Sequence, residues 1–375
     1  MARIFTFLCL ILFLGGNHRV YASLLFGNAE IKPQLLLNTV YDDNIAYNKT
    51  NKKADFRQDL GFGLKANFAR KAYGLDLAAN IIRRTYNKFN KFNNTFEDAS
   101  LKIYGEPSGV SRFILTDNFI HSVDPFSFED EFGNSQERTS YWRNTIGLQY
   151  TQELSRRWNM IFGYANSIND YSRKDLIDSY YNLFSYETDY ALSSRLVVLA
   201  YYQFLDYHYE HLGDIKSQRL AAGSRYYITN QLYWDFRLGE DFITTLDKDK
   251  KRGDFLSATL TNEPDPNSQF SLSYSRQTSP SYYSQNLFKS ERISLSWVRQ
   301  LLERLAANLN AFWGKGRYTE GGTKEDTVGV GAGISFEINR QMRFSLNYSF
   351  SYKTSDTLGD GYRRNAVTLG LRYEF

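Results

Sequence analysis

The last ten residues of the chain read "AVTLGLRYEF", from Ala366 to Phe375, and they alternate between two kinds of side chain. Charged, polar or small side chains separate the apolar ones, which is the period of a β-strand with one apolar face. That face either rests on the core of a soluble protein or meets lipid in a sheet that closes on itself. The apolar positions are Val367, Leu369, Leu371, Tyr373 and Phe375.

The N-terminal residues predict a secretory signal peptide over 1–22. Arg3 precedes an apolar run from Ile4 to Leu14, which is shorter than the roughly 20 residues that cross a bilayer, and small-residue cleavage positions end at Ala22. The only cysteine, Cys9, lies in this segment, so disulfides are not expected in the mature chain. We therefore expect residues 23–375 to form a single domain.

The composition restricts this domain to two classes. Only 42% of the 375 residues are hydrophobic, the mean hydropathy is −0.49, and no later segment is long and apolar enough for a transmembrane helix. A soluble secreted β-protein and a transmembrane β-barrel both fit, because alternating strands hide their hydrophobicity from an average. The 29 Tyr and 28 Phe favour the barrel, whose membrane interfaces carry aromatic girdles. The net charge of +4 is spread along the chain and gives no support to nucleic-acid binding.

Alternating segments and turn residues recur throughout the mature chain. The connections alternate between short and long, which is typical of an antiparallel up-and-down outer-membrane barrel with short periplasmic turns and long outer loops. Eighteen strands are predicted, with sixteen as the alternative count, and a β-sandwich fits this asymmetry poorly. The predicted strands are 31–42, 55–69, 73–86, 95–104, 109–121, 140–153, 157–170, 178–190, 194–208, 216–229, 231–245, 253–262, 268–278, 288–300, 303–317, 326–338, 341–354 and 363–375.

The alternation assigns faces to the strands. In 55–69 the apolar side chains of Phe56, Leu60 and Phe62 are predicted to face lipid, with Arg57 and Asp59 on the other face. The segment 195–204, "RLVVLAYYQF", is apolar on both faces, so we expect one face to pack on a neighbour or on an inward-folded loop.

Charged side chains are predicted to line the lumen, with sixteen cations against nine anions. Such an excess would favour anionic solutes, although mutual neutralisation across a wet lumen is the alternative. The predicted inward anions are Asp55, Asp59, Asp76, Asp98, Glu153, Asp235, Asp241, Glu337 and Glu374. The predicted pore-lining cations are Arg57, Lys65, Arg84, Lys102, Arg112, Arg143, Arg157, Arg219, Arg225, Arg237, Arg292, Arg304, Arg343, Lys353, Arg364 and Arg372.

The third long connection, 122–139, is the longest and is locally acidic. In general porins the third outer loop folds into the barrel and narrows it, and this position suggests the same role here, with a solvated surface loop as the alternative. The candidate constriction residues are Asp124, Glu129, Asp130 and Glu131.

No pattern in the sequence indicates an enzyme, a metal site or a cofactor site. His208 and His211 are three residues apart, which places them on opposite faces of a strand; the alternative is a loop in which they converge on a metal with Glu210 or Asp214. His121 lacks an identifiable serine partner in the nearby sequence, and nucleophilic hydrolysis needs a nucleophile and a base within hydrogen-bond reach.

Two stretches resemble a family of outer-membrane β-barrel porins of Gram-negative bacteria. They are "PQLLLNTVYDDNIAYN", 33–48, and "ADFRQDLGFGLKANF", 54–68. The C-terminal Tyr373 and Phe375 also resemble the terminal signal of outer-membrane barrels, which implies recognition by the barrel-assembly machinery. Members of the family are often associated with exopolysaccharide or capsule export, so the resemblance implies passage of an acidic polysaccharide or oligosaccharide.

The sequence thus predicts a bacterial outer-membrane porin in contact with membrane lipid, which passes polar, anionic solutes or saccharides. The alternative is a structural or adhesive barrel with a closed lumen and partner-binding loops. A hydrolase on a loop or a rim would require a Ser/His/acid cluster or a metal site.

Overall fold

The computed structural model describes residues 24–26, 28–124, 138–173, 176–281, 286–319, 321–356 and 361–375. The predicted signal peptide, 1–22, lies outside these residues. Within them no helix is long and apolar enough to cross a membrane.

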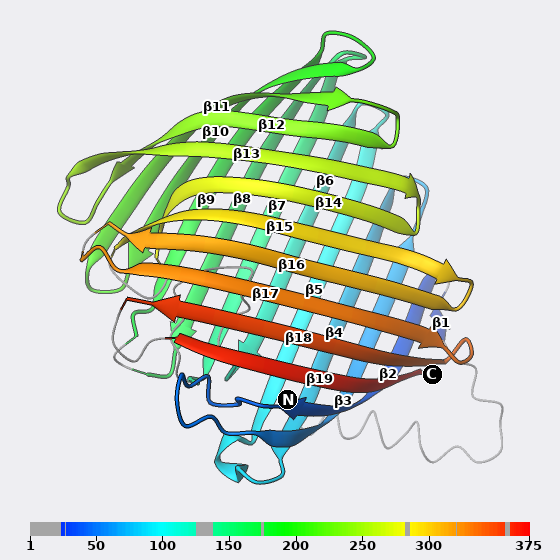
Figure 1. The fold of residues 1–375 in the computed structure, drawn as a ribbon. Helices are drawn as coiled ribbons and strands as arrows, with labels where there is room; N and C mark the ends of the chain where they lie inside the picture. The colour runs from blue at the N-terminus through cyan, green and yellow to red at the C-terminus, as the bar shows by residue number, and fades with distance from the viewer. Residues whose placement is uncertain are drawn as a thin grey trace.

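The described chain forms a closed antiparallel barrel of eighteen strands (Figure 1). Each strand pairs with the next one along the chain, and β19 closes the barrel by pairing with β2 from Ala366 opposite Asp42 to Glu374 opposite Gln34. The prediction of an eighteen-stranded barrel is therefore confirmed. The strands are β2 (Ala29–Asp42), β3 (Asp55–Ala69), β4 (Tyr73–Tyr86), β5 (Asn94–Ser108), β6 (Ser111–Ser122), β7 (Tyr141–Ser155), β8 (Trp158–Tyr171), β9 (Ser179–Ala191), β10 (Leu196–Tyr209), β11 (Gly213–Tyr227), β12 (Leu232–Thr244), β13 (Lys250–Asp265), β14 (Ser268–Pro280), β15 (Leu287–Leu302), β16 (Leu305–Tyr318), β17 (Lys324–Glu337), β18 (Met342–Ser355) and β19 (Gly361–Glu374).

Two further elements were not predicted. β1 (Leu24–Phe26) pairs with the start of β2, where Phe26 lies opposite Ala29. β19 leaves this part of β2 uncovered, since its last contact is the Phe375 N–H donating to the Pro33 carbonyl at 3.0 Å. β1 therefore pairs with the backbone groups at the start of β2 that β19 does not reach. The second element is a single 3₁₀ turn, η1 (Asn90–Phe92), in the connection after β4.

Predicted and observed strand ends differ where the ladder contains an irregularity. The strand predicted to end at 104 continues to Ser108, because the register shifts between Gly105 and Ser108 and the pairing with β6 resumes beyond the shift. A β-bulge of this kind interrupts the period of two without ending the strand.

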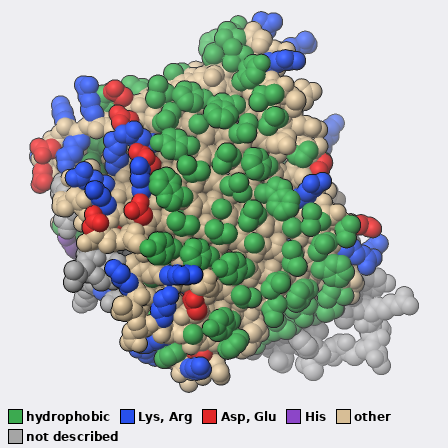
Figure 2. Space-filling model, viewed as in Figure 1, with side chains coloured by type: hydrophobic (Ala, Val, Ile, Leu, Met, Phe, Trp, Pro, Cys, Tyr) green, Lys and Arg blue, Asp and Glu red, His purple; other side chains and the backbone are tan. Residues whose placement is uncertain are grey.

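The outward face of the barrel is apolar over its middle and over the turn end (Figure 2). Large side chains such as Leu60, Leu238 and Trp313 are 49%, 58% and 40% exposed, as expected of a face that is turned to lipid. Burial follows the other face, where Gln34, Asp59 and Asp241 are almost completely covered. The barrel thus places apolar groups outside and polar groups inside.

Candidate functional site: the charged inner wall and its loop end

All but two of the sixteen predicted pore-lining cations lie on strands at positions that share the inward face. The cross-strand pairs show this directly, since Arg84 lies opposite Asp59, and Arg364 lies opposite Ser351. Lys65, Lys102, Arg112, Arg343 and Arg372 belong to the same alternating set.

Arg157 and Arg304 were predicted on strands, and the structure corrects this. β8 begins at Trp158 and β16 at Leu305, so both arginines lie in the two-residue turns that precede these strands. The apolar residues beside them continue the alternation into the turns, which is why the pattern alone included them in strands.

The inner wall carries more carboxylates than predicted. Asp42, Glu187, Asp189 and Glu325 also have inward positions, and three of them pair with predicted cations. Arg364 Nη2 lies 2.9 Å from Asp42, Lys353 Nζ 3.0 Å from Glu325, and Arg237 Nη1 2.8 Å from Glu187. The excess of positive charge is therefore smaller than sixteen against nine, and neutralisation within the wall is extensive.

One group of ion pairs follows the inner wall from β9 to β12. Arg219 contacts Asp241 at 2.7 Å through Nε and 3.2 Å through Nη2, and its guanidinium lies 3.9 Å from the centroid of the Phe255 ring. Arg225 contacts Asp235 at 2.7 Å, and Arg237 contacts the same carboxylate at 3.1 Å. Paired guanidinium groups held in this way are fixed in position and face the lumen.

A second group surrounds Asp124, two residues beyond the end of β6. Its carboxylate lies 2.5 Å from Arg84 Nη1, 2.9 Å from Arg138 Nη1 and 3.7 Å from Arg57 Nη1. Arg84 belongs to β4 and Arg57 to β3, so the start of the third long connection leans inward across β5. Glu129, Asp130 and Glu131 lie outside the described residues, and their role in a constriction stays a prediction.

The electrostatics of this group fix the protonation of Asp124. Burial of the carboxyl raises its pKa, but Arg138, Arg84 and Arg57 lower it more, so the pKa lies below its ordinary value of 3.8. For Arg138, burial lowers the pKa, but the Asp124 carboxylate together with Tyr86 and Tyr47 raises it by more, so the pKa lies above its ordinary value and the guanidinium stays charged.

Arg138 also connects the third long connection to the first two. Its Nε donates to the Ile45 carbonyl at 2.8 Å, and its guanidinium lies 5.1 Å from the Tyr86 ring and 5.2 Å from the Phe92 ring. The Asp55 carboxylate accepts backbone N–H bonds from residues 88 and 89 at 3.0 Å. Three connections are therefore packed together at the loop end of β2–β7.

The loop end of β9–β12 has a different lining. Tyr207, Tyr209, Ile215, Ile243 and Leu287 form a buried apolar cluster inside the barrel. The Tyr209 hydroxyl donates to the Ser281 carbonyl at 2.5 Å, which brings the connection after β14 onto β10. The cluster begins just beyond the segment 195–204, with Leu205 and Tyr207, so the expected packing of that segment itself on a neighbour or a loop stays a prediction.

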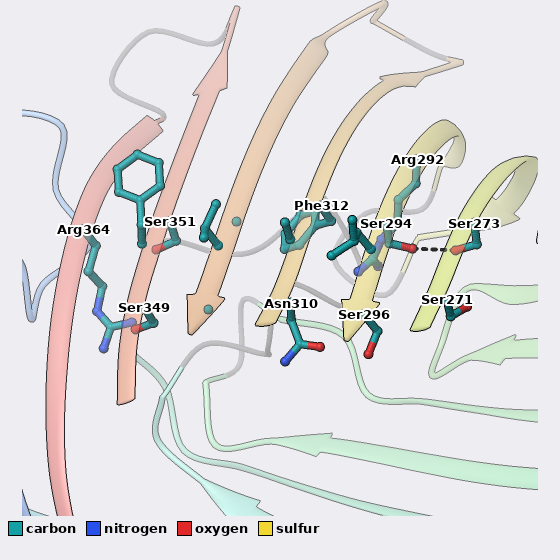
Figure 3. Close-up of a pocket in the computed structure, with 16 residues that line it drawn as sticks. Ser271, Ser273, Arg292, Ser294, Ser296, Asn310, Phe312, Ser349, Ser351 and Arg364 are labelled. Atoms are coloured by element: carbon teal, nitrogen blue, oxygen red, sulfur yellow. Dashed lines mark hydrogen bonds between the residues drawn. The ribbon is translucent and has the colours of Figure 1, made fainter. Parts of the chain in front are cut away.

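Between these two regions, the inner wall formed by β14–β19 carries mainly small and polar side chains. A hollow of about 430 Å³ is lined by the serines of β14, β15 and β18, with Arg292 and Arg364 at its borders (Figure 3). Ser273 and Ser294 hydrogen-bond at 2.7 Å, and the guanidinium of Arg292 lies 4.5 Å from the Phe312 ring centroid. Hydroxyl groups and guanidinium groups are the partners that a polar solute requires in a channel.

The three histidines among the described residues, His121, His208 and His211, lie at the loop rim. His121 Nε2 lies 3.1 Å from Ser140 Oγ, and its Nδ1 lies 3.6 Å from Glu97 Oε2. The nearby sequence identified no serine partner for His121, and the fold supplies one, since Ser140, the residue before β7, lies within hydrogen-bond distance. His208 contacts Asp214 at 2.5 Å, and His211 is in the turn between β10 and β11. The described residues contain no group of three or more His, Cys, Asp or Glu side chains that could hold a metal ion.

The fold and the inner wall define a transmembrane β-barrel with a polar interior. Residues 252–375 match the family described as "Putative beta-barrel porin 2", which confirms the resemblance to outer-membrane porins. No curated protein matches the sequence at a significant level. The chain is therefore a closed β-barrel whose C-terminal third is similar to this porin family, and its location is the bacterial outer membrane.

Solved structures share the architecture at low sequence identity. Pseudomonas aeruginosa OpdQ has a TM-score of 0.50 and 9% identity, with 92% of this chain and 97% of that chain covered. P. aeruginosa OpdO gives 0.49 and 10%, covering 94% and 98%, and Acinetobacter baumannii OccAB3 gives 0.48 and 13%, covering 92% and 99%. At such identities the likeness to OpdQ supports the barrel fold alone.

Proposed function

We propose that the protein is a passive channel for small polar solutes, with a preference for anionic solutes or saccharides. The observation that carries the proposal is the inner wall itself, where fixed guanidinium groups lie on both sides of a serine-lined surface. A barrel of eighteen strands is wide enough to enclose water. No step of chemistry at the wall is needed for diffusion through it.

The preference for anions rests on where the arginines are held. Arg219, Arg225 and Arg237 point inward from two adjacent strands, and a low-dielectric wall concentrates their field in the lumen. Because carboxylates such as Glu187 and Asp235 accompany them, we expect weak selectivity rather than exclusion of cations.

The test is single-channel conductance of the refolded full-length mature chain in planar bilayers. A salt gradient gives the permeability ratio from the reversal potential, and an acidic oligosaccharide is added to each side in turn. Anion-selective current that the oligosaccharide blocks supports the proposal, and block by the matched neutral oligosaccharide alone would restrict it to saccharides. Cation-selective current that neither compound blocks would refute it.

Export of an acidic exopolysaccharide is the finer form of this proposal, and it rests on the family resemblance. In the same bilayers, a long acidic polysaccharide that threads the pore gives blocks whose duration grows with chain length and with voltage. If the acidic polymer changes the current no more than a neutral polymer does, the export proposal is refuted and the channel proposal is restricted to small solutes.

A structural or adhesive barrel with a closed lumen is the alternative that the loop end favours. The packed connections around Asp124 and the apolar cluster around Tyr207 both lie at that end of the barrel, and they support this alternative. Correctly folded protein, shown by circular dichroism and by heat-dependent migration on gels, that carries no current would establish this alternative.

A second candidate function is hydrolysis of an ester at the outward rim, favoured by the contact of Ser140 with His121. In such a reaction the Ser140 Oγ attacks the acyl carbonyl carbon, and His121 takes the hydroxyl proton and passes it to the departing alcohol. Water then releases the acid and restores the serine. Glu97 lies on the other side of the imidazole, where the third member of such a group stands.

The rim site is tested with a fluorophosphonate probe on folded protein in detergent. Labelling that is lost in Ser140→Ala and His121→Ala, and kept in Ser172→Ala at the same rim, supports hydrolysis. Equal labelling of all these variants would remove this candidate and leave the channel proposal unaffected.

A further inference from the structure

The outward face of β13–β17 carries a group of charged side chains at the loop ends of the strands, which we name the loop-end patch. Figure 2 shows basic and acidic side chains gathered at the left of the barrel, where Figure 1 shows the loop ends of β16 and β18. Its basic members are Lys250, Arg252, Arg276, Lys289, Lys315, Arg317 and Lys324.

The strand register places the patch directly beyond the lipid-facing belt. Ile293 pairs with Trp313, and both side chains are exposed, at 42% and 40%. The next pair on the same face, two residues closer to the loops, is Glu291 with Lys315. The outward face therefore changes from apolar to charged between one residue pair and the next. We take this as the level at which the hydrocarbon core of the membrane meets the lipid head groups.

Acidic side chains hold the basic ones in place without neutralising the patch. Arg276 Nη2 lies 3.1 Å and Lys289 Nζ 3.5 Å from the same Asp254 carboxylate, and Lys315 Nζ lies 3.2 Å from Glu291. With Asp326 the patch contains three carboxylates for seven basic groups. The ion pairs are weak because one member of each is exposed, Lys315 by 51% and Asp254 by 66%, so the basic groups can also bind an anion.

The position of the patch selects one kind of anion. A ligand that touches the basic groups while its apolar part lies against Ile293 and Trp313 must carry an anionic head on hydrocarbon tails. Lysine and arginine bind phosphate, and each basic residue near a membrane surface strengthens the attraction to anionic lipid. The long loops mark this end of the barrel as the outer leaflet.

We propose that the loop-end patch binds the phosphate groups of a phosphorylated glycolipid in the outer leaflet. The patch is outside the barrel, so this proposal is independent of conduction through the lumen. Bound lipid would hold β13–β17 in the membrane at a defined depth and orientation.

The test is binding of diphosphorylated lipid A to the purified, folded barrel in detergent, measured by native mass spectrometry and by titration. The patch variant is Arg276→Gln, Lys289→Gln, Lys315→Gln. The control variant removes the same charge from the turn rim, through Lys71→Gln, Arg156→Gln, Arg195→Gln. We expect the patch variant to bind at least about tenfold more weakly and the control variant to bind like the unchanged protein.

Two further probes separate a lipid site from general attraction of anions. Dephosphorylated lipid A should bind the unchanged protein weakly, and millimolar inorganic phosphate should displace little of the diphosphorylated lipid. Equal weakening in the patch and control variants, or equal affinity for the phosphorylated and dephosphorylated lipids, would overturn the proposal. Heat-dependent gel migration of every variant shows that the barrel has folded.

Discussion

At the scale of the residue, Asp124 determines how the third long connection is held. One carboxylate contacts guanidinium groups from β4, from β3 and from the other end of its own connection. Removing one member of such a group leaves buried charges without their partner, which costs more than the pairs contribute when intact. The local sequence could not identify this role, because the arginines lie 40 and 67 residues before Asp124 in the chain.

The substitution Asp124→Asn is expected to lower the free energy of unfolding by about 3 kcal/mol. We also expect larger fluctuations of the open-channel current, because the connection is no longer held against β4. Urea unfolding followed by tryptophan fluorescence and bilayer recordings measure the two effects. Asp247→Asn, at an exposed loop position, is the control and should change neither; an unchanged current in Asp124→Asn would show that the connection is held elsewhere.

The pH dependence of the same contact follows from the lowered pKa of Asp124. The folded-state pKa lies below the value in the unfolded chain, so the stabilisation is complete above the ordinary aspartate range and is lost as the pH falls through the folded pKa. Current fluctuations should therefore be the same at pH 7 and pH 5 and increase only below about pH 4. Recordings in steps from pH 7 to pH 3 test this, and an increase near pH 6 would contradict it.

At the scale of the element, the close approach of β16 and β17 depends on Gly329. A Cβ at this position would lie 2.2 Å from the Phe312 ring, whereas a Cβ at Gly331 would meet only the Tyr348 carbonyl at 4.0 Å. The Arg292 guanidinium lies over the Phe312 ring. Gly329, the ring and the guanidinium therefore form one side of the serine-lined hollow.

Gly329→Ala should displace Phe312 and lower the free energy of unfolding by about 1–3 kcal/mol, and Gly331→Ala should be close to neutral. The two substitutions add the same group to the same strand and the same face. Urea midpoints of the two variants give the comparison. Equal midpoints would show that the Phe312 ring moves aside without cost.

The elements themselves could be predicted to within a few residues from the sequence. The period of two and the polar connections are local properties, and β3 and β4 begin and end where the pattern predicts. What could not be predicted depends on contacts between distant strands. Ser140 reaches His121 only through the pairing of β6 with β7, and Glu187 reaches Arg237 across two intervening strands.

At the scale of the whole molecule, the charge of the wall is a balance between groups of ion pairs that different strands supply. The arginines of β11 and β12 face carboxylates of β9 and β12, while those of β3, β4 and β19 face Asp59, Asp124 and Asp42. Ion selectivity therefore depends on the small difference between the total positive and the total negative charge of the inner wall. Removal of a few charges of one sign should reverse the selectivity.

Replacing Arg219, Arg225 and Arg237 together by glutamine should convert the channel from weakly anion-selective to cation-selective. The three arginines are gone while Glu187, Asp235 and Asp241 stay on the wall, so the field in that part of the lumen changes sign. The reversal potential in a salt gradient measures the change. Replacement of the same three residues by lysine keeps the charge and should keep the anion preference. This control separates the effect of charge from the effect of altered packing. The same reversal potential in the glutamine and lysine variants would mean that permeating ions do not pass this part of the wall.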